Sequence, residues 1–461
     1  MNVKHIFFFL CFSWVSTTFA QTKVWDGGAG TNAFGDAANW NPDGIPGVSD
    51  DLEIGFGNLV DLLAGNYTVR NIKISGYDAV FTIHEGATLT IANSTGTAFD
   101  AAGSSSQVIN RGSLEITNSG FYGLLIYGVF TNDTTGVITI TNAGDYGIVT
   151  GTNDTLYNHG NIIIDGSSNH SVYNTGTVTN YNTGTIQISN SASYGFRNGS
   201  NDFLNNYGNL VINGAVNFSL ENSGIATNYS GGHISIIGGS EIGLNNRNKF
   251  WNQSGATIEI LSPGDGFGDY GINNDLNDSV FNAGLIHVSQ ASDDGIYNNG
   301  YILNEASGVI VVDTSGVDHP GYGIYVRAGH PLTNAGSITI NGASDHGLYN
   351  DATFSNLSGA SMIILNVSGS GIFNGAADLL DNAGTLLVSS AEQYGLRNFG
   401  HVLNAANGTL TIQQSVLENL RNEFQDLIEN YGTIHLHNAG TTGVWNTGAI
   451  LLKTGGAILV D

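Results

Sequence analysis

The stretch "YGFRNGSNDFLNNYGNLVI", residues 194–212, contains a pattern that returns along most of the chain. A Tyr-Gly pair precedes an apolar residue, here Phe196, and Asn198 follows two positions later. After a short loop, a second asparagine and a glycine lead to Leu210 and Ile212. Apolar residues two positions apart are typical of extended chain with both side chains on one face, and the surrounding Gly and Asn residues argue against long helices. Each unit therefore predicts short strands joined by turns.

The unit recurs with a fixed period. The position of Leu210 occurs fourteen times, in steps of 24 residues apart from two steps of 28. A second apolar column lies two residues after the first and includes Ile212, and a third column includes Phe196. The first column consists of Leu114, Ile138, Ile162, Ile186, Leu210, Ile234, Ile258, Ile286, Ile310, Ile338, Met362, Leu386, Leu410 and Ile434.

A short unit of strands and turns that repeats many times predicts an all-β fold, a right-handed parallel β-helix (solenoid) of about 14 coils, each lying about 4.8 Å from the next. One coil buries too little apolar surface to offset the entropy of ordering its backbone, so the coils are stable only as an array. We divide the chain into a signal peptide (1–20), a small N-terminal β module or cap (21–75), the β-helix repeats (76–452) and a C-terminal tail (453–461). The two 28-residue steps predict longer loops at 261–271 and 313–323.

Asparagine forms two further columns. One asparagine follows the third apolar column by two residues, as Asn198 does, and the other precedes the glycine of each unit, as Asn206 does. Stacked side-chain amides hydrogen-bond along a fibre-like array, and asparagine tolerates left-handed backbone at turns. We therefore expect both columns to lie at corners of the coils.

The first 20 residues predict a cleaved secretory signal, with Lys4 before an apolar run and the small residues Thr18 and Ala20 after it. The apolar run is shorter than the roughly 20 residues of a membrane span, so no transmembrane segment is expected. The only cysteine, Cys11, lies in this signal. We therefore expect a secreted or cell-surface protein without disulfides or thiol chemistry.

The charge balance excludes one large class of partners. The chain has 12 Lys and Arg residues against 38 Asp and Glu residues, a formal net charge of −26. Binding to nucleic acid needs clustered basic side chains, so no nucleic-acid partner is expected. A hydrophobic content of 41% also argues against disorder and for a buried core.

The segment "VWDGGAGTNAFGDAANWNPDGIPGVSDDLEIG", residues 24–55, stands ahead of the repeats. Trp25, Trp40, the "NWNPDGIPG" turn cluster and the acidic pair before an apolar strand resemble the N-terminal module of large secreted surface proteins of the Bacteroidetes group, and more loosely the start of autotransporter passengers. The repeats resemble a generic pectin-lyase-like solenoid. The resemblance implies surface display, with an adhesive or extracellular-matrix role. Taken as residues alone, the segment predicts a cap over the open edge of the first coil.

Pectin-degrading β-helix enzymes place acidic and basic side chains on neighbouring coils, and the weak catalytic candidates here are Asp294, Asp345 and His346. The "DHG" of residues 345–347 resembles the Gly-His-Gly of polygalacturonases only faintly. Asp294 and His346 occupy one column two coils apart, with Tyr322 between them, and the rest of that column is mostly aromatic and is expected to stack at a corner.

No metal site is predicted, because the histidines lack the spacing of a zinc site. The acidic stretches at 264–269 and 273–278 are the only candidates for Ca²⁺, and neither has the spacing of a known calcium loop. Solvated loop carboxylates are the favoured interpretation, so no cofactor is expected.

The candidate binding residues lie in one outward column, immediately after the third apolar column. Rings on four consecutive coils followed by two arginines predict an exposed stripe with a spacing of about 4.8 Å. Contiguous exposed aromatic residues mark partner surfaces, and rings beside arginine suit sugar faces or acidic glycans. The alternative is that aromatic residues simply pack well on any β surface. The stripe consists of Tyr297, Tyr325, Tyr349, Phe373, Arg397 and Arg421.

Three functions remain after these exclusions. The favoured one is a secreted or surface-displayed scaffold that adheres to extracellular polysaccharide or cell-surface glycan without catalysis. The alternative is a polysaccharide-active enzyme, a lyase or glycoside hydrolase. An ice-binding solenoid would need a regular outward Thr ladder, and the nearest column, from Thr139 to His287, is too irregular.

Overall fold

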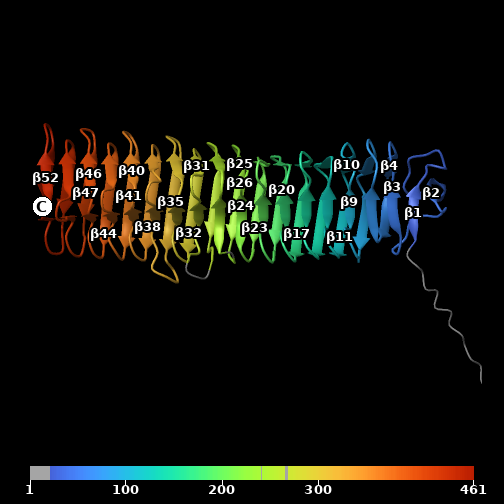
Figure 1. Cartoon of the computed structure of the whole chain (residues 1–461), viewed down its shortest axis with the longest axis horizontal. Helices are drawn as coiled ribbons and strands as arrows, with labels where there is room; N and C mark the ends of the chain where they lie inside the picture. Colours follow the sequence, from blue (N-terminus) through green and yellow to red (C-terminus); the bar gives the residue numbers. More distant parts are fainter. Residues whose placement is uncertain (1–20, 240, 265–267) are drawn as a thin grey trace, which may run out of the picture.

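The computed structural model describes residues 21–239, 241–264 and 268–461, and these form a rod built from three parallel sheets (Figure 1). The chain winds through sheets A, B and C in turn and adds one strand to each per coil. The described strands make seventeen coils, from β3–β5 at one end of the rod to β51–β53 at the other. The predicted parallel β-solenoid is confirmed, and it has seventeen described coils rather than about fourteen.

Sheet A starts with the two strands of the cap and continues with the first strand of every coil. Its strands are β1 (Thr22–Trp25), β2 (Trp40–Asn41), β3 (Asp51–Ile54), β6 (Asn71–Ile74), β9 (Phe99–Ala101), β12 (Leu124–Ile126), β15 (Ile148–Thr150), β18 (Val172–Asn174), β21 (Phe196–Asn198), β24 (Phe218–Asn222), β27 (Ile242–Asn246), β30 (Ile272–Asn274), β33 (Ile296–Asn298), β36 (Ile324–Val326), β39 (Leu348–Asn350), β42 (Ile372–Asn374), β45 (Leu396–Asn398), β48 (Leu420–Asn422) and β51 (Val444–Asn446).

Sheet B contains the second strand of every coil. Its strands are β4 (Leu59–Leu62), β7 (Val80–Ile83), β10 (Gln107–Asn110), β13 (Val129–Asn132), β16 (Thr155–Asn158), β19 (Thr177–Asn180), β22 (Phe203–Asn206), β25 (Ile225–Asn228), β28 (Lys249–Asn252), β31 (Ser279–Asn282), β34 (Tyr301–Asn304), β37 (Leu332–Asn334), β40 (Thr353–Asn356), β43 (Leu379–Asn382), β46 (His401–Asn404), β49 (Leu427–Asn430) and β52 (Ala449–Leu452).

Sheet C contains the third strand of every coil. Its strands are β5 (Gly65–Val69), β8 (Ala87–Ala92), β11 (Ser113–Ser119), β14 (Val137–Ala143), β17 (Asn161–Ser167), β20 (Thr185–Ser189), β23 (Asn209–Asn213), β26 (His233–Ile237), β29 (Thr257–Leu261), β32 (Leu285–Ala291), β35 (Val309–Ser315), β38 (Ser337–Ala343), β41 (Ser361–Val367), β44 (Thr385–Ala391), β47 (Thr409–Gln413), β50 (Thr433–His437) and β53 (Ala457–Val460).

The predicted register is confirmed in sheet C, where Ile138 pairs with Ile162 and Ile162 pairs with Ile186. Both columns of sheet C and the column of sheet A point inward and are buried. Sheet B adds a fourth inward apolar column, which includes Phe130 and Leu156 and was not predicted. From β10 to β49 it lacks a period-2 apolar partner, because the next inward position on these strands is asparagine.

Three coils lie outside the predicted count, and the spacing of the first two is irregular. In sheet C, Tyr67 pairs with Leu89 and Leu89 with Leu114, so the first steps differ from 24 residues. The last coil, β51–β53, continues all three sheets beyond the fourteenth predicted unit. The strands β3 to β5 follow the same three-sheet register, and the segment that covers the first coil is 22–50.

The cap closes the N-terminal end of the core with rings. Strand β1 pairs with β3, and β2 pairs antiparallel with β1 after the short 3-10 helix η1 (Ala37–Asn39). Trp25 and Phe34 each lie edge-on to Trp40, with ring centroids 5.1 and 5.2 Å apart. All three side chains are buried, so the apolar end of the first coil is covered.

Both predicted asparagine columns form hydrogen-bonded ladders inside the rod. In sheet B, which carries the long ladder, thirteen successive Nδ2–H···Oδ1 bonds of 2.7–2.9 Å connect Asn110 to Asn430. In sheet A, which carries the broken ladder, equivalent bonds run from Asn174 to Asn298 and from Asn350 to Asn446. Left-handed backbone occurs elsewhere, at the corner after sheet C, where Asn118 has a φ of 55°.

The Tyr-Gly pairs have a packing reason. A Cβ at Gly195 would lie 2.4 Å from the Cγ2 of Ile212 and 2.6 Å from the carbonyl oxygen of Ser219. At Gly195 the corner between sheets C and A therefore approaches the next coil too closely for a side chain. The two longer loops lie at this same corner, between β29 and β30 and between β35 and β36.

Candidate functional site

The six predicted stripe residues lie together on the outer face of sheet A. They come from β33, β36, β39, β42, β45 and β48, and each pairs in register with the next, as Tyr325 does with Tyr349. Their inward neighbours, such as Ile324 and Leu348, are buried in the core. The alternation of side chains along a strand therefore places all six outside.

Every stripe residue is half-buried, because a second row of rings packs beside it. This corner row precedes the glycines between sheets C and A. Tyr270 stacks on Tyr297 at a centroid distance of 4.6 Å, and Tyr322 stacks on Tyr349 at 4.8 Å. Burial among these rings raises the pKa of Tyr325 to about 12.

The corner row itself was expected to stack, and it does so over much of the rod. Its rings stack across neighbouring coils, as Tyr194 does on Phe218 at 5.1 Å with 4° between the planes. Tyr122 and Tyr146 stack at 5.4 Å, and His170 lies 4.5 Å from Tyr194. The stripe and the corner row together form one aromatic surface.

Ring orientation determines what this surface presents. Tyr349 and Phe373 are nearly parallel, with centroids 4.8 Å apart and 9° between the planes. Tyr325 is turned across the stack, at 84° to Tyr297 and 79° to Tyr349. Because the parallel rings share their faces along the rod, they present edges and hydroxyl groups outward.

The two arginines extend the stripe beyond Phe373. The guanidinium of Arg397 lies 4.6 Å from the ring centroid of Phe399, and that of Arg421 lies 4.0 Å from the ring centroid of Trp445. Both donate to Glu423, at 3.0 and 2.8 Å. Burial acts to raise the pKa of Glu423, but these hydrogen bonds outweigh it and lower that pKa. The arginines are thus held in place while 30% and 22% of their side chains remain exposed.

The weak catalytic candidates do not converge on one point. Backbone hydrogen bonds place Asp294, Tyr322 and His346 on successive coils, so the ring separates the carboxyl from the imidazole. Asp294 is only 4% exposed, and burial raises its pKa to about 8. Its Oδ1 accepts a hydrogen bond of 2.7 Å from the backbone N–H of Tyr322.

The imidazole of His346 is also engaged within the fold. Its Nδ1 accepts a hydrogen bond of 2.9 Å from the backbone N–H of Ser370 and lies 3.2 Å from Asp345. Burial lowers the pKa of His346, although the charge of Asp345 acts in the opposite direction. The fold therefore brings Asp345 and His346 together and places Asp294 on the other side of Tyr322.

A charged cluster on the same face was not predicted. Glu221 points outward from β24, yet it is fully buried. The guanidinium of Arg247 lies 3.2 Å from one of its carboxylate oxygens, and Arg197 lies 3.6 Å from the other. The sequence did contain a signal for this cluster. Arg197 and Arg247, two of the few basic residues, stand on either side of the outward Glu221. The guanidinium of Arg247 also lies 5.8 Å from the ring centroid of Phe218, and that of Arg197 lies 5.5 Å from that of Tyr194, which no spacing reveals.

In the described parts of the chain, no group of three or more His, Cys, Asp or Glu side chains is placed to hold a metal ion. The acidic stretch 264–269 includes residues 265–267, which lie outside the described residues, as does the predicted signal peptide 1–20. Among the described residues, no helix has the length and apolar character of a membrane span.

No protein-family model and no curated protein matches the chain. Among solved structures, it is similar to the crystal structure of residues 55–350 of TibA, hyper-glycosylated by TibC. The two chains are 13% identical, the match covers 83% of this chain and 95% of the other, and the TM-score is 0.21.

Proposed function

We propose that this protein is an extracellular adhesive scaffold that binds polysaccharide along the outer face of sheet A. The observation that carries the proposal is the in-register stripe from Tyr297 to Arg421, six side chains on six successive coils. The core does not need rings at these positions, because their inward neighbours already fill it.

The chemistry of the stripe suits a sugar chain. Tyrosine hydroxyls and guanidinium groups donate hydrogen bonds to sugar oxygens, and the ring edges offer apolar contact to C–H groups. Successive coils repeat this contact about every 4.8 Å. Each contact is weak, and many act together on a long polymer.

Binding without cleavage is favoured by the state of the acidic residues. A catalytic acid must contact the glycosidic oxygen, and Asp294 is 4% exposed. The two arginines of the stripe are paired with Glu423. We therefore do not propose a lyase or hydrolase activity.

A glycan array probed with the full secreted chain tests the proposal. We expect retention of a polysaccharide, and loss of most of that signal when Tyr297, Tyr325, Tyr349 and Phe373 are all replaced by Ala. Far-ultraviolet circular dichroism and the thermal midpoint establish that the variant is folded. Equal retention of polysaccharide by the folded variant and the parent would overturn the proposal.

A further inference from the structure

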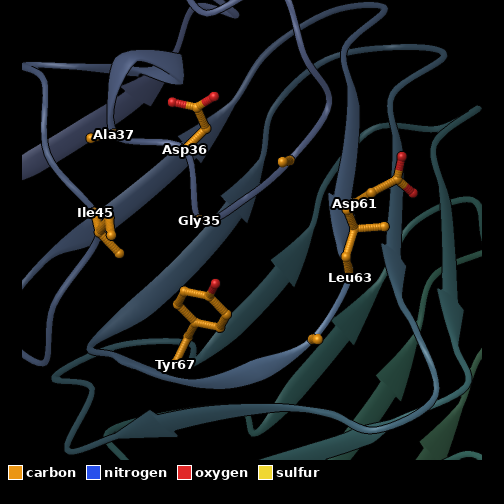
Figure 2. Close-up of a pocket in the computed structure, with 9 residues that line it drawn as sticks. Gly35, Asp36, Ala37, Ile45, Asp61, Leu63 and Tyr67 are labelled. Carbon is orange, nitrogen blue, oxygen red and sulfur yellow. The ribbon is translucent and has the colours of Figure 1, made fainter.

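A pocket of about 540 Å³ opens where the cap meets the first coil (Figure 2). The lining residues include Gly35, Asp36 and Ile45 from the cap and Asp61, Leu63 and Tyr67 from the first coil. The backbone joins the two parts here, because the N–H of Phe34 donates to the carbonyl of Asp61 at 2.9 Å. The pocket is therefore held between two connected elements, and its size falls in the range of small-molecule sites.

Tyr67 lies at the centre of the pocket, and its hydroxyl points toward Gly35 (Figure 2). The ring is fixed from behind by Phe34, with centroids 5.0 Å apart. A Cβ at position 35 would lie 2.2 Å from the hydroxyl oxygen, so a larger residue there would displace the Tyr67 side chain. Within the described residues, the Tyr67 hydroxyl has no hydrogen-bond partner. It is thus a positioned donor and acceptor that the fold leaves unused.

Two aliphatic side chains stand on either side of Tyr67 (Figure 2). Ile45 and Leu63 are each 56% exposed. Together with neighbouring alanines, they give the pocket apolar walls. A ligand for this space must offer apolar faces as well as a group for the Tyr67 hydroxyl.

The polar groups at the rim are acceptors. Asp36 accepts from the hydroxyl of Thr31 at 3.3 Å, and Asp61 contacts the imidazole of His84 at 2.9 Å. Each carboxylate is oriented by its partner and has remaining lone pairs. No lysine or arginine lines the pocket. The site therefore accepts hydroxyl donors and repels anions.

We propose that this pocket binds one uncharged sugar residue, the terminal unit of a glycan chain. A pyranose has apolar C–H faces and hydroxyl edges, which match the aliphatic walls, the Tyr67 hydroxyl and the two carboxylates. The inference rests on the proposed function in one respect, which is that the ligand is taken to be a saccharide. The pocket is a second site. It disfavours anionic groups, whereas the arginine end of the stripe attracts them.

Saturation-transfer difference NMR and calorimetry on the full secreted chain test the pocket. The probes are glucose, galactose, mannose and N-acetylglucosamine, with glucuronate and choline for comparison. We expect at least one neutral sugar to bind, with glucuronate at least tenfold weaker. Tyr67→Phe, which keeps the ring, should weaken neutral-sugar binding about five- to tenfold, as expected for one lost hydrogen bond.

Leu59→Ser is the matched control, because Leu59 is 50% exposed on the neighbouring strand β4 and does not line the pocket. The fourfold stripe variant should keep full binding of the monosaccharide, so failure of the stripe and failure of the pocket are distinguishable. Absence of neutral-sugar binding, unchanged affinity in Tyr67→Phe, or preference for choline would each overturn the assignment.

Discussion

Val326 pairs in register with Asn350 in sheet A and leaves the Oδ1 atom of Asn350 without a hydrogen-bond donor. On the other side of the break, the Nδ2 of Asn298 donates to the backbone carbonyls of His330 and Pro331, at 3.3 and 3.4 Å. A single valine thus divides the broken ladder into two. A buried acceptor without a donor costs on the order of 1–3 kcal/mol.

Replacing this valine tests the energetic role of the ladder. Val326→Asn supplies a donor to Asn350 and an acceptor to Asn298, so we expect the free energy of unfolding to rise by about 1 kcal/mol. The matched control is Val402→Asn in the aliphatic column of sheet B, which is equally buried and adjoins no open ladder position. It should lower the thermal midpoint. Equal losses in both variants would show that ladder continuity carries no energy.

The buried glutamate of the charged cluster gives a second prediction. Glu221→Ala removes the buried carboxylate between Arg197 and Arg247 and leaves Arg247 with only its exposed partner Asp275, so we expect destabilisation by about 2 kcal/mol or more. Glu259→Ala is the control, because Glu259 is half exposed and lies 3.8 Å from His233. Such surface pairs contribute at most about 1 kcal/mol. Chemical denaturation of both variants measures the difference, and similar midpoints would contradict the buried assignment.

The inside and outside assignment of sheet C is tested by two neighbours on β23. Ile212 is fully buried, whereas Val211 points outward and is half exposed. Ile212→Asp places an unpaired charge in the core and should cost several kcal/mol. Val211→Asp should change the thermal midpoint little. Equal thermal shifts would mean that the register is wrong.

The pH dependence of stability is expected to carry the signature of Asp294. Burial raises its pKa from 3.8 to about 8, so the native state binds a proton that the unfolded state releases. Its contribution to stability is complete below pH 3.8 and is lost as the pH rises through 8. Asp294→Asn cannot titrate and keeps an acceptor for the Tyr322 N–H.

The thermal midpoint of Asp294→Asn relative to the parent should therefore increase between pH 4.5 and 8.5. The neighbouring carboxyls Asp293 and Asp345 remain in both proteins, and their charges contribute to the raised pKa of Asp294. A difference that stays constant over this range would rule out a buried protonated carboxyl at position 294.

The strands of the repeats were predictable where the period comes from one cause, the burial of apolar side chains in the core. Pairs such as Leu210 and Ile212 must both point inward, so spacing alone identifies the strand and its register. In sheet B, Leu156 is followed at the next inward position by Asn158, and a polar ladder residue hides the strand from a hydrophobic pattern. The first coils change their step length, which removes the period itself.

The candidate surface was predictable only in outline. Strand parity places Tyr325 outside once Ile324 is known to be inside. The crossed orientation of that ring and the burial of Glu221 depend on which rotamers pack best among neighbours from three coils. Such packing joins residues more than 20 positions apart and leaves no spacing signal. The pocket at Tyr67 likewise depends on how two irregular segments fold against each other.

The most direct test of the account compares two aromatic faces of the same rod. Tyr349→Ala combined with Phe373→Ala removes two stacked rings from sheet A, and Trp251→Ala combined with Phe281→Ala removes a stacked pair, 5.1 Å apart, from the outer face of sheet B. The affinity for the polysaccharide identified on the array is measured for both folded variants. We predict that the sheet A variant loses at least tenfold in affinity while the sheet B variant retains the affinity of the parent. Equal affinities of the two variants would contradict the assignment of sheet A as the binding face.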